Sequence, residues 1–149
     1  AAVVRVGTDV TVVSVGPLVQ EALKAADALL KVGRSVEVID LRTIRPIDFP
    51  TVLASVRKTR HLVVADSDWP HCGVASALIS NVSQNAFEAL KAAPVAVTWP
   101  DHPVPASSAI DVGYYPMAKE IIAAISQVLA HDKPLANTDV TQKQMHGPF

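Results

Sequence analysis

The 149-residue chain contains a single cysteine, Cys72, and this scarcity removes two classes of structure. One cysteine cannot form an internal disulfide, and it cannot supply the thiolates of a cysteine zinc site. The histidines are scattered through the sequence without the short spacings that are typical of zinc ligands. The cysteine usage is compatible with a reducing cytosol.

Charge of either sign is also scarce, since only 18% of the residues are charged and the formal net charge is −1. Proteins that bind nucleic acid or an anionic membrane need a basic patch, so we expect neither partner. No apolar run approaches the ~20 residues of a membrane-spanning helix. The first ten residues lack both the pattern of a signal peptide and an initiating methionine. The sequence leaves open whether the chain is a fragment or a natural single-domain protein.

Half of the residues are hydrophobic but only 5% are aromatic, so alanine, valine and leucine must build the core. Apolar runs rich in β-branched residues alternate along the chain with segments of helical periodicity. The runs predict strands at residues 3–6, 10–15, 36–41, 62–65 and 95–99. The periodic segments predict helices at residues 18–32, 49–58, about 74–90 and 116–130.

Strands that are joined through helices are parallel and have right-handed crossovers. The predicted fold is therefore a three-layer α/β/α sandwich with a five-stranded, mostly parallel sheet and one antiparallel edge strand. Because only Gly7 to Asp9 separate the first two strands, we expect these two to form an antiparallel hairpin. Residues 1–130 are predicted to form this single domain, and the polar residues 131–149 a flexible tail.

Phosphate and carboxylate motifs are weak in this chain. Gly16-Pro17 joins a predicted strand to a helix, but without G-x-G-x-x-G or a Walker lysine it indicates a plain turn. Asp66 and Asp68 follow a strand, where α/β sheets place ligands. We interpret them as a solvated turn and a helix cap, in preference to an acid–base or metal pair.

His71 and Cys72 are neighbours, which suggests a nucleophile with its base. No third group orients such a pair, so we interpret Cys72 as a small buried residue. Asp48, in turn, is predicted to cap the helix that begins near Phe49. The sequence therefore predicts no catalytic, cofactor-binding or metal-ligating residue within the chain.

Three longer motifs follow one another along the chain: VEVIDLRTIRPID at residues 36–48, HLVVADSDWPHCG at residues 61–73 and PDHPVPASSAIDVGYYP at residues 100–116. In this order they closely resemble the C-terminal domain of transketolase-like thiamine diphosphate enzymes. The form DLRT-x-RP-x-D is nearest to the β subunit of the E1 component of 2-oxoacid dehydrogenase complexes, of pyruvate, branched-chain or acetoin type. The resemblance covers about residues 3–129 and implies a mixed five-stranded sheet between helices.

The resemblance implies a parent enzyme that decarboxylates a 2-oxo acid oxidatively on thiamine diphosphate and transfers the acyl group to the lipoyl arm of E2. In that family two other domains hold most of the thiamine diphosphate and Mg²⁺, so this domain is expected to bind neither and to be inactive alone. Its implied role is assembly with the E1 α subunit, a second E1 β subunit and the E2 acyltransferase core. A homodimer is a further expectation. The implied location is the cytoplasm, or the mitochondrial matrix in a eukaryote.

From the same motifs we predict an interface that serves subunit assembly and docking. Its residues are Arg42, Arg45, Asp48, Asp101, Pro103, Pro105, Asp111, Tyr114 and Tyr115. Each arginine could clamp a carboxylate of a partner, although a local ion pair is the simpler use. For every one of these residues, the alternative is a rigid loop that serves only its own domain.

Two other functions compete with this interpretation. Another thiamine-dependent relative, such as 1-deoxyxylulose-phosphate synthase or transketolase, is disfavoured by the form of the first motif. A freestanding binding module without thiamine chemistry is supported by residues 71–77, where family glycines are replaced. Ala77 stands where the family often has a Glu, and Ala106 where it often has an aromatic residue.

Overall fold

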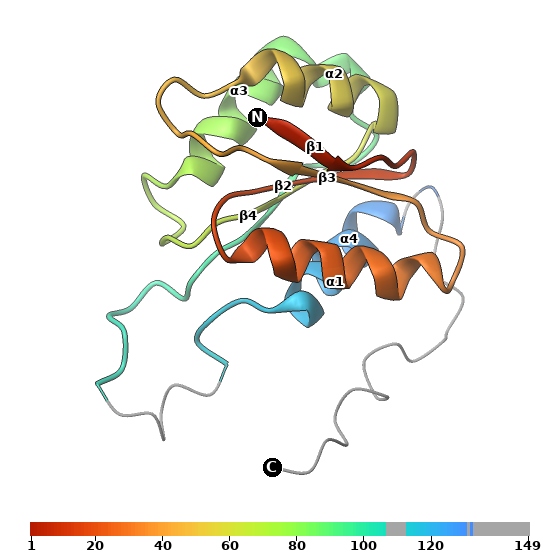
Figure 1. Ribbon diagram of the computed structural model, residues 1–149. Coiled ribbons are helices and arrows are strands. Elements are labelled where there is room, and N and C mark those ends of the chain that lie inside the picture. The colour runs from red at the N-terminus through yellow and green to blue at the C-terminus, as the bar shows by residue number, and fades with distance from the viewer. Residues whose placement is uncertain (107–112, 131, 133–149) are drawn as a thin grey trace.

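The structure, a computed structural model, describes residues 1–106, 113–130 and 132. One sheet lies between two helical layers (Figure 1). Its strands are β1 (Ala2–Arg5), β2 (Val10–Ser14), β3 (Val36–Asp40), β4 (Leu62–Ala65) and β5 (Val95–Val97). Helices α2 (Phe49–Thr59) and α3 (Val74–Asn85) cover one face, and α1 (Leu18–Leu30) and α4 (Ala118–Leu129) cover the other. A 3-10 turn, η1 (Phe87–Ala89), follows α3.

The strands lie in the order β1-β3-β2-β4-β5, and every neighbouring pair is parallel except β1 with β3. This arrangement confirms the predicted α/β sandwich with an antiparallel edge strand. All residues of β2 and β4 are buried, as expected for central strands that are covered by helices on both faces. In the part of the chain that the structure describes, no helix is long and apolar enough to cross a membrane.

The predicted hairpin between the first two strands is wrong, because β1 pairs with β3 and not with β2. Both edges of β2 are occupied by parallel partners, β3 and β4. After β1 the chain crosses the start of β3, where the amides of Thr8 and Asp9 donate to the carbonyl of Ser35 at 3.1 and 2.8 Å. Gly7 permits the crossing, since a Cβ there would lie 2.2 Å from the backbone of Val36.

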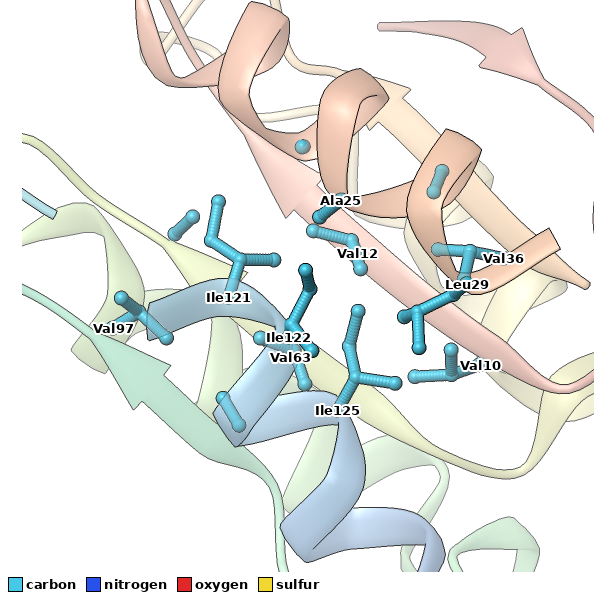
Figure 2. Close-up of a cluster of buried hydrophobic side chains, with 14 of the residues drawn as sticks. Val10, Val12, Ala25, Leu29, Val36, Val63, Val97, Ile121, Ile122 and Ile125 are labelled. Carbon is cyan, nitrogen blue, oxygen red and sulfur yellow. The ribbon is translucent and has the colours of Figure 1, made fainter. Parts of the chain in front are cut away.

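Alternate residues of the central strands point into two separate cores. Val12 of β2 lies in the cluster beneath α1 and α4 (Figure 2), whereas Val13 lies in the cluster beneath α2 and α3. In the first cluster Leu29 of α1 and Ile121 and Ile125 of α4 are fully buried. Burying one such side chain contributes about 2 kcal/mol of hydrophobic free energy. The two cores fix the helical layers on the sheet.

Two helix ends follow local sequence signals, and a third departs from the predicted position. Asp48 caps α2 as predicted, since its carboxylate accepts the Thr51 amide at 3.2 Å. Gly33 adopts a φ of 76° just after α1, a conformation that glycine favours, and ends that helix. The helix predicted over residues 74–90 is shorter, because Ala86 leaves the helical region with a φ of −147°. The chain then continues as η1.

Candidate functional site

The carboxyl ends of the parallel strands meet at one edge of the sheet, here called the carboxyl edge. Four segments form it: residues 41–48 after β3, 66–73 after β4, 98–106 after β5 and 113–117 before α4. Open α/β sheets bind ligands at this edge. The predicted interface residues fall in these segments, apart from Asp111, which lies outside the described residues.

The turn after β3 contains both predicted arginines. Arg42 has a φ of 60°, and its amide donates to the Asp40 carboxylate at 3.0 Å. Its guanidinium lies 3.7 Å from the same carboxylate, so the expected local ion pair is present. Arg45 is exposed next to Ile44, which is 55% exposed. The tip of the turn therefore presents a cation and an apolar side chain.

Asp48 ends this turn and uses both carboxylate oxygens within the domain. One oxygen accepts the Thr51 amide, and the other accepts the Thr51 hydroxyl at 2.7 Å. The hydrogen bonds from the Thr51 hydroxyl and the Thr51 amide lower the pKa of Asp48 below its usual value. The main role of Asp48 is therefore to cap the N-terminus of α2.

Four aromatic residues from three of the segments form a cluster at the carboxyl edge: Trp69, Trp99, Tyr114 and Tyr115. Trp99 is its centre, with ring centroids 5.8 Å from Trp69, 5.9 Å from Tyr114 and 5.9 Å from Tyr115. The Trp69 and Tyr115 rings meet it nearly edge-on, a favourable geometry for aromatic pairs. The aromatic cluster therefore joins the loops after β4 and β5 to the start of α4.

The backbone carbonyl of His102 fixes the loop after β5 to this aromatic cluster. It accepts hydrogen bonds from the Trp69 indole at 3.1 Å and from the Tyr114 hydroxyl at 2.9 Å. Tyr114 is only 4% exposed, so its side chain supports the loop from within the domain. These contacts hold the following residues, Pro103 and Val104, at the surface. Sequence reasoning missed this carbonyl, because every residue has one.

The remaining predicted residues of this loop differ in exposure. Asp101 is exposed, and its carboxylate lies 3.4 Å from the His71 ring of the neighbouring loop. Pro103 is exposed, whereas Pro105 is half-buried. Of the three predicted residues in this loop, Asp101 and Pro103 are therefore the two that the structure leaves open to a partner.

Apolar side chains are concentrated at the carboxyl edge. Among the described residues ten large hydrophobic side chains are exposed, and five of them lie in these segments. The five are Ile44, Trp69, Val104, Tyr115 and Met117. Exposed apolar residues that gather on one side of a protein mark an interaction surface, whereas isolated ones do not.

The loop after β4 contains the predicted acidic turn and the single cysteine. Asp66 is buried, so the predicted solvated turn is wrong for this residue, but its carboxylate accepts the Ala75 amide at 2.8 Å and thus caps the start of α3 as predicted. Gly73 gives this carboxylate room, since a Cβ there would lie 2.8 Å from it. The interpretation of Cys72 as buried is wrong: the residue has a φ of 63° and is exposed. Its turn conformation directs it away from the core.

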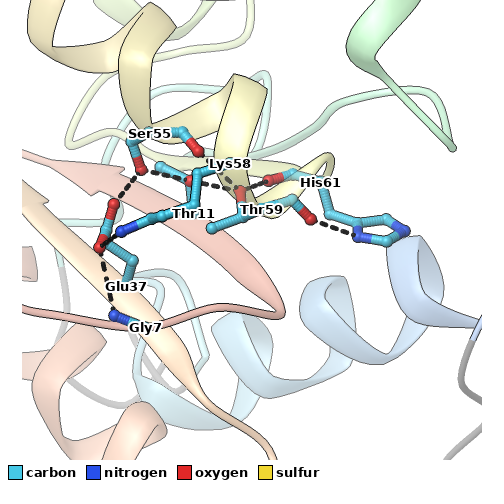
Figure 3. Close-up of polar contacts among 7 residues, drawn as sticks. All are labelled: Gly7, Thr11, Glu37, Ser55, Lys58, Thr59 and His61. Carbon is cyan, nitrogen blue, oxygen red and sulfur yellow. Dashed lines mark hydrogen bonds and ion pairs between the residues drawn. The ribbon is translucent and has the colours of Figure 1, made fainter.

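A buried polar network lies near the opposite edge of the sheet, where the parallel strands begin (Figure 3). Glu37 of β3 is 2% exposed and accepts hydrogen bonds from Ser55, Lys58 and the Gly7 amide. Thr11 of β2 lies 2.6 Å from the Ser55 hydroxyl. Burial raises the pKa of Glu37, but the hydrogen bonds from Lys58, Ser55 and Gly7 outweigh it, so the pKa lies below its usual value.

The carboxylates of Asp48, Asp66 and Glu37 are engaged in contacts within the domain. Asp48 and Asp66 cap helices, and Glu37 is saturated by its neighbours. Within the described residues, no group of three or more histidine, cysteine or carboxylate side chains is arranged to hold a metal ion. In the part of the chain that the structure describes, the carboxyl edge therefore stands out by its exposed apolar side chains and not by a set of metal donors.

Residues 1–121 match the family model for the transketolase C-terminal domain. The β subunit of acetoin:2,6-dichlorophenolindophenol oxidoreductase from Cupriavidus necator is 43% identical over 133 residues, which are 89% of this chain and 39% of that protein. The β subunits of the pyruvate dehydrogenase E1 component from Homo sapiens (mitochondrial) and Bacillus subtilis are 42% and 38% identical. Each alignment includes 87% of this chain, and it spans 36% of the human protein and 39% of the Bacillus protein.

Among solved structures, the split-gene transketolase, described as an inactive β4 tetramer, matches with a TM-score of 0.73 and 28% identity over 87% of this chain and 41% of that one. A 2-oxoglutarate:ferredoxin oxidoreductase from Magnetococcus marinus matches with a TM-score of 0.54 and 13% identity, over 85% of this chain and 18% of that one, and so shares the fold alone. The chain spans about two-fifths or less of each curated relative named above. It belongs to the transketolase C-terminal domain family and corresponds to that domain in the β subunits of E1-type dehydrogenases.

Proposed function

We propose that this chain is the assembly and docking domain of an E1 β subunit. The parent enzyme would carry out thiamine diphosphate-dependent oxidative decarboxylation of a 2-oxo acid and transfer the acyl group to lipoyl-E2. Identities of 38–43% to such β subunits support this assignment. The two other domains of the parent would hold thiamine diphosphate and Mg²⁺.

The observation that carries the docking role is the exposed apolar surface of the carboxyl edge, whose loop is held in place by contacts within the domain. The aromatic cluster and the His102 carbonyl hold Val104 and Pro103 outward without any partner present. A loop that is already held in its binding conformation loses little entropy on association. Such preorganisation favours a docking surface over a loop that serves only its own domain.

The proposed partners are the E1 α subunit, a second E1 β subunit and the E2 acyltransferase core. At the carboxyl edge Ile44, Val104 and Tyr115 would supply apolar contact area, and Arg45 and Asp101 would supply charged rim contacts. Asp111 remains a proposed member of this interface. The proposed location is the cytoplasm, or the mitochondrial matrix in a eukaryote, as the name of the human relative suggests.

Two binding measurements on the purified chain test this function together. We expect calorimetry with thiamine diphosphate and Mg²⁺ to show no heat of binding. We expect the immobilised chain to retain the E1 α subunit or the E2 core of the source organism. Micromolar thiamine diphosphate binding would contradict the first expectation, and failure to retain either protein would contradict the docking role.

A further inference from the structure

A hollow of about 650 Å³ lies where α3 ends and η1 begins. Its lining comes from Arg57 of α2 and from residues 84–89. Cavities of roughly 300–1,000 Å³ hold small molecules, which they orient through a few polar groups beside an apolar wall. Both kinds of group are present here, because Arg57 and Glu88 are charged and Phe87 is aromatic.

Arg57 supplies a cation that is held in place. Its guanidinium donates to the Asn85 carbonyl at 2.9 Å, and the residue is exposed. Arg57 has no other hydrogen-bond or ion-pair partner among the described residues. Several N–H groups of the guanidinium are therefore left for a ligand. A carboxylate is the group that such a guanidinium binds best, through two parallel hydrogen bonds.

Glu88 supplies an anion on the wall of the same hollow. The residue is exposed, and within the described part of the chain it forms no hydrogen bond or ion pair, with Arg57 or any other residue. Helix α3 also ends at Asn85 without a basic residue in its last turn. The C-terminus of a helix carries a partial negative charge that favours a cation. This side of the hollow is therefore suited to an ammonium group.

Phe87 supplies an apolar surface between these charges in the lining. It is the first residue of η1 and is 73% exposed. Covering an aromatic ring with another apolar group is favourable, and a second ring can add an edge-on or offset contact. The hollow thus offers one cation, one anion and one exposed ring.

We propose that this hollow binds a free α-amino acid with a large apolar or aromatic side chain. The ligand carboxylate binds Arg57, its ammonium binds Glu88 at the end of α3, and its side chain packs on Phe87. A zwitterion matches the two opposite charges. A phosphate ester would be repelled by Glu88, and a simple amine would be repelled by Arg57.

This site is separate from the carboxyl edge. Helix α3 begins directly after the loop that follows β4 and ends at Asn85 on the opposite side of the sheet. There the amide of Lys91, just after η1, donates to the carbonyl of Arg60, just before β4. Amino-acid binding can therefore fail while docking through the carboxyl edge holds, and the reverse is also true.

A nuclear magnetic resonance titration of the ¹⁵N-labelled 149-residue chain with L-phenylalanine tests the proposal. We expect saturable shift changes at the amides of Arg57 and residues 84–89. Three probes each lack one feature of the ligand: 3-phenylpropionate lacks the ammonium, phenethylamine lacks the carboxylate, and glycine lacks the side chain. The loss of a charged contact should weaken binding about tenfold, and glycine should bind more weakly than L-phenylalanine.

Substitutions test the three contacts from the side of the protein. Arg57→Gln should weaken L-phenylalanine binding about tenfold, and Glu88→Gln about threefold. Phe87→Ser should weaken it about fivefold. The matched controls are Lys31→Gln and Leu30→Ser, an exposed cation and an exposed apolar residue at the end of α1. Both should leave the binding unchanged, and circular dichroism checks that every variant is folded.

Three results would overturn the proposal. The first is an absence of saturable shift changes with L-phenylalanine, and the second is shift changes centred outside the hollow. The third is equal binding of L-phenylalanine and 3-phenylpropionate, or of the wild type and Arg57→Gln, because one charged contact would then be absent. None of these results affects the docking role, which is measured by retention of the E1 α subunit or the E2 core.

Discussion

The two edges of the sheet are held together by opposite kinds of contact. Where the parallel strands begin, Glu37, Ser55 and Thr11 form a buried polar network. Where they end, the aromatic cluster joins the loops and lies partly at the surface. A buried polar network stabilises its own domain but has no surface that a partner can contact. Exposed aromatic rings can stabilise their own domain and also contact a partner. The first edge therefore contributes to stability, and we propose recognition as the role of the second.

The largest expected effect is on the buried polar network. Glu37→Ala leaves Ser55 and the Gly7 amide without their acceptor, and should lower the free energy of unfolding by about 3 kcal/mol. Urea denaturation monitored by circular dichroism measures this. The matched control is Glu88→Ala, an exposed glutamate, which should change the free energy by less than about 0.5 kcal/mol. A loss as small for Glu37→Ala as for the control would remove the assignment of stability to this edge.

The same network makes stability depend on pH. The pKa of Glu37 in the folded chain lies below 4.5, its usual value. Its contribution is therefore present in full above pH 4.5 and is lost as the pH falls through the folded value. The urea midpoint of the wild type should exceed that of Glu37→Gln at neutral pH, and the difference should shrink on acidification. A difference that is independent of pH would show that the charge of Glu37 does not matter.

A smaller effect is expected at the aromatic cluster. Tyr114→Phe keeps the ring contacts but removes the hydroxyl that donates to the His102 carbonyl, at a cost of about 1 kcal/mol in unfolding free energy. Because this bond positions the loop, partner binding should weaken more than stability. Denaturation and partner binding measured on the same variant separate the two. Equal losses in both would argue for a purely structural role.

The smallest effect is expected at the turn after β3. Asp48→Ala removes the cap of α2 and should lower the melting temperature by about 3 °C. Asp48→Asn retains a capping oxygen and should recover most of the loss. Scanning calorimetry of the two variants compares them directly. An unchanged melting temperature for Asp48→Ala would contradict the capping role that the contacts with Thr51 indicate.

Local patterns predicted most of the fold, because helices and buried strands are encoded by neighbouring residues. The Asp48 cap and the Gly33 stop are examples. The pairing of β1 was predicted wrongly, since it depends on Gly7 meeting a strand some thirty residues further along the chain. A short loop favours a hairpin only when the neighbouring edge is free, and on β2 it is not.

The site was predictable only in part. Motifs identified the turn containing Arg45 and the loop containing Asp101 as surface elements, and both are exposed. The buried network around Glu37 was not predicted, because the partners of Glu37 lie at distant positions in the sequence and one of them is the backbone amide of Gly7. The exposure of Cys72 depends on a left-handed turn that a cysteine gives no reason to expect.

The most direct test of the central claim compares two valines at opposite ends of the sheet. Val104 lies at the carboxyl edge, and Val6 follows β1 near the start of β3; both are exposed. Val104→Asp should reduce binding of the E1 α subunit or the E2 core, measured by biolayer interferometry, by roughly tenfold or more. Val6→Asp should leave that binding unchanged. Equal effects of the two substitutions would contradict the assignment of recognition to the carboxyl edge.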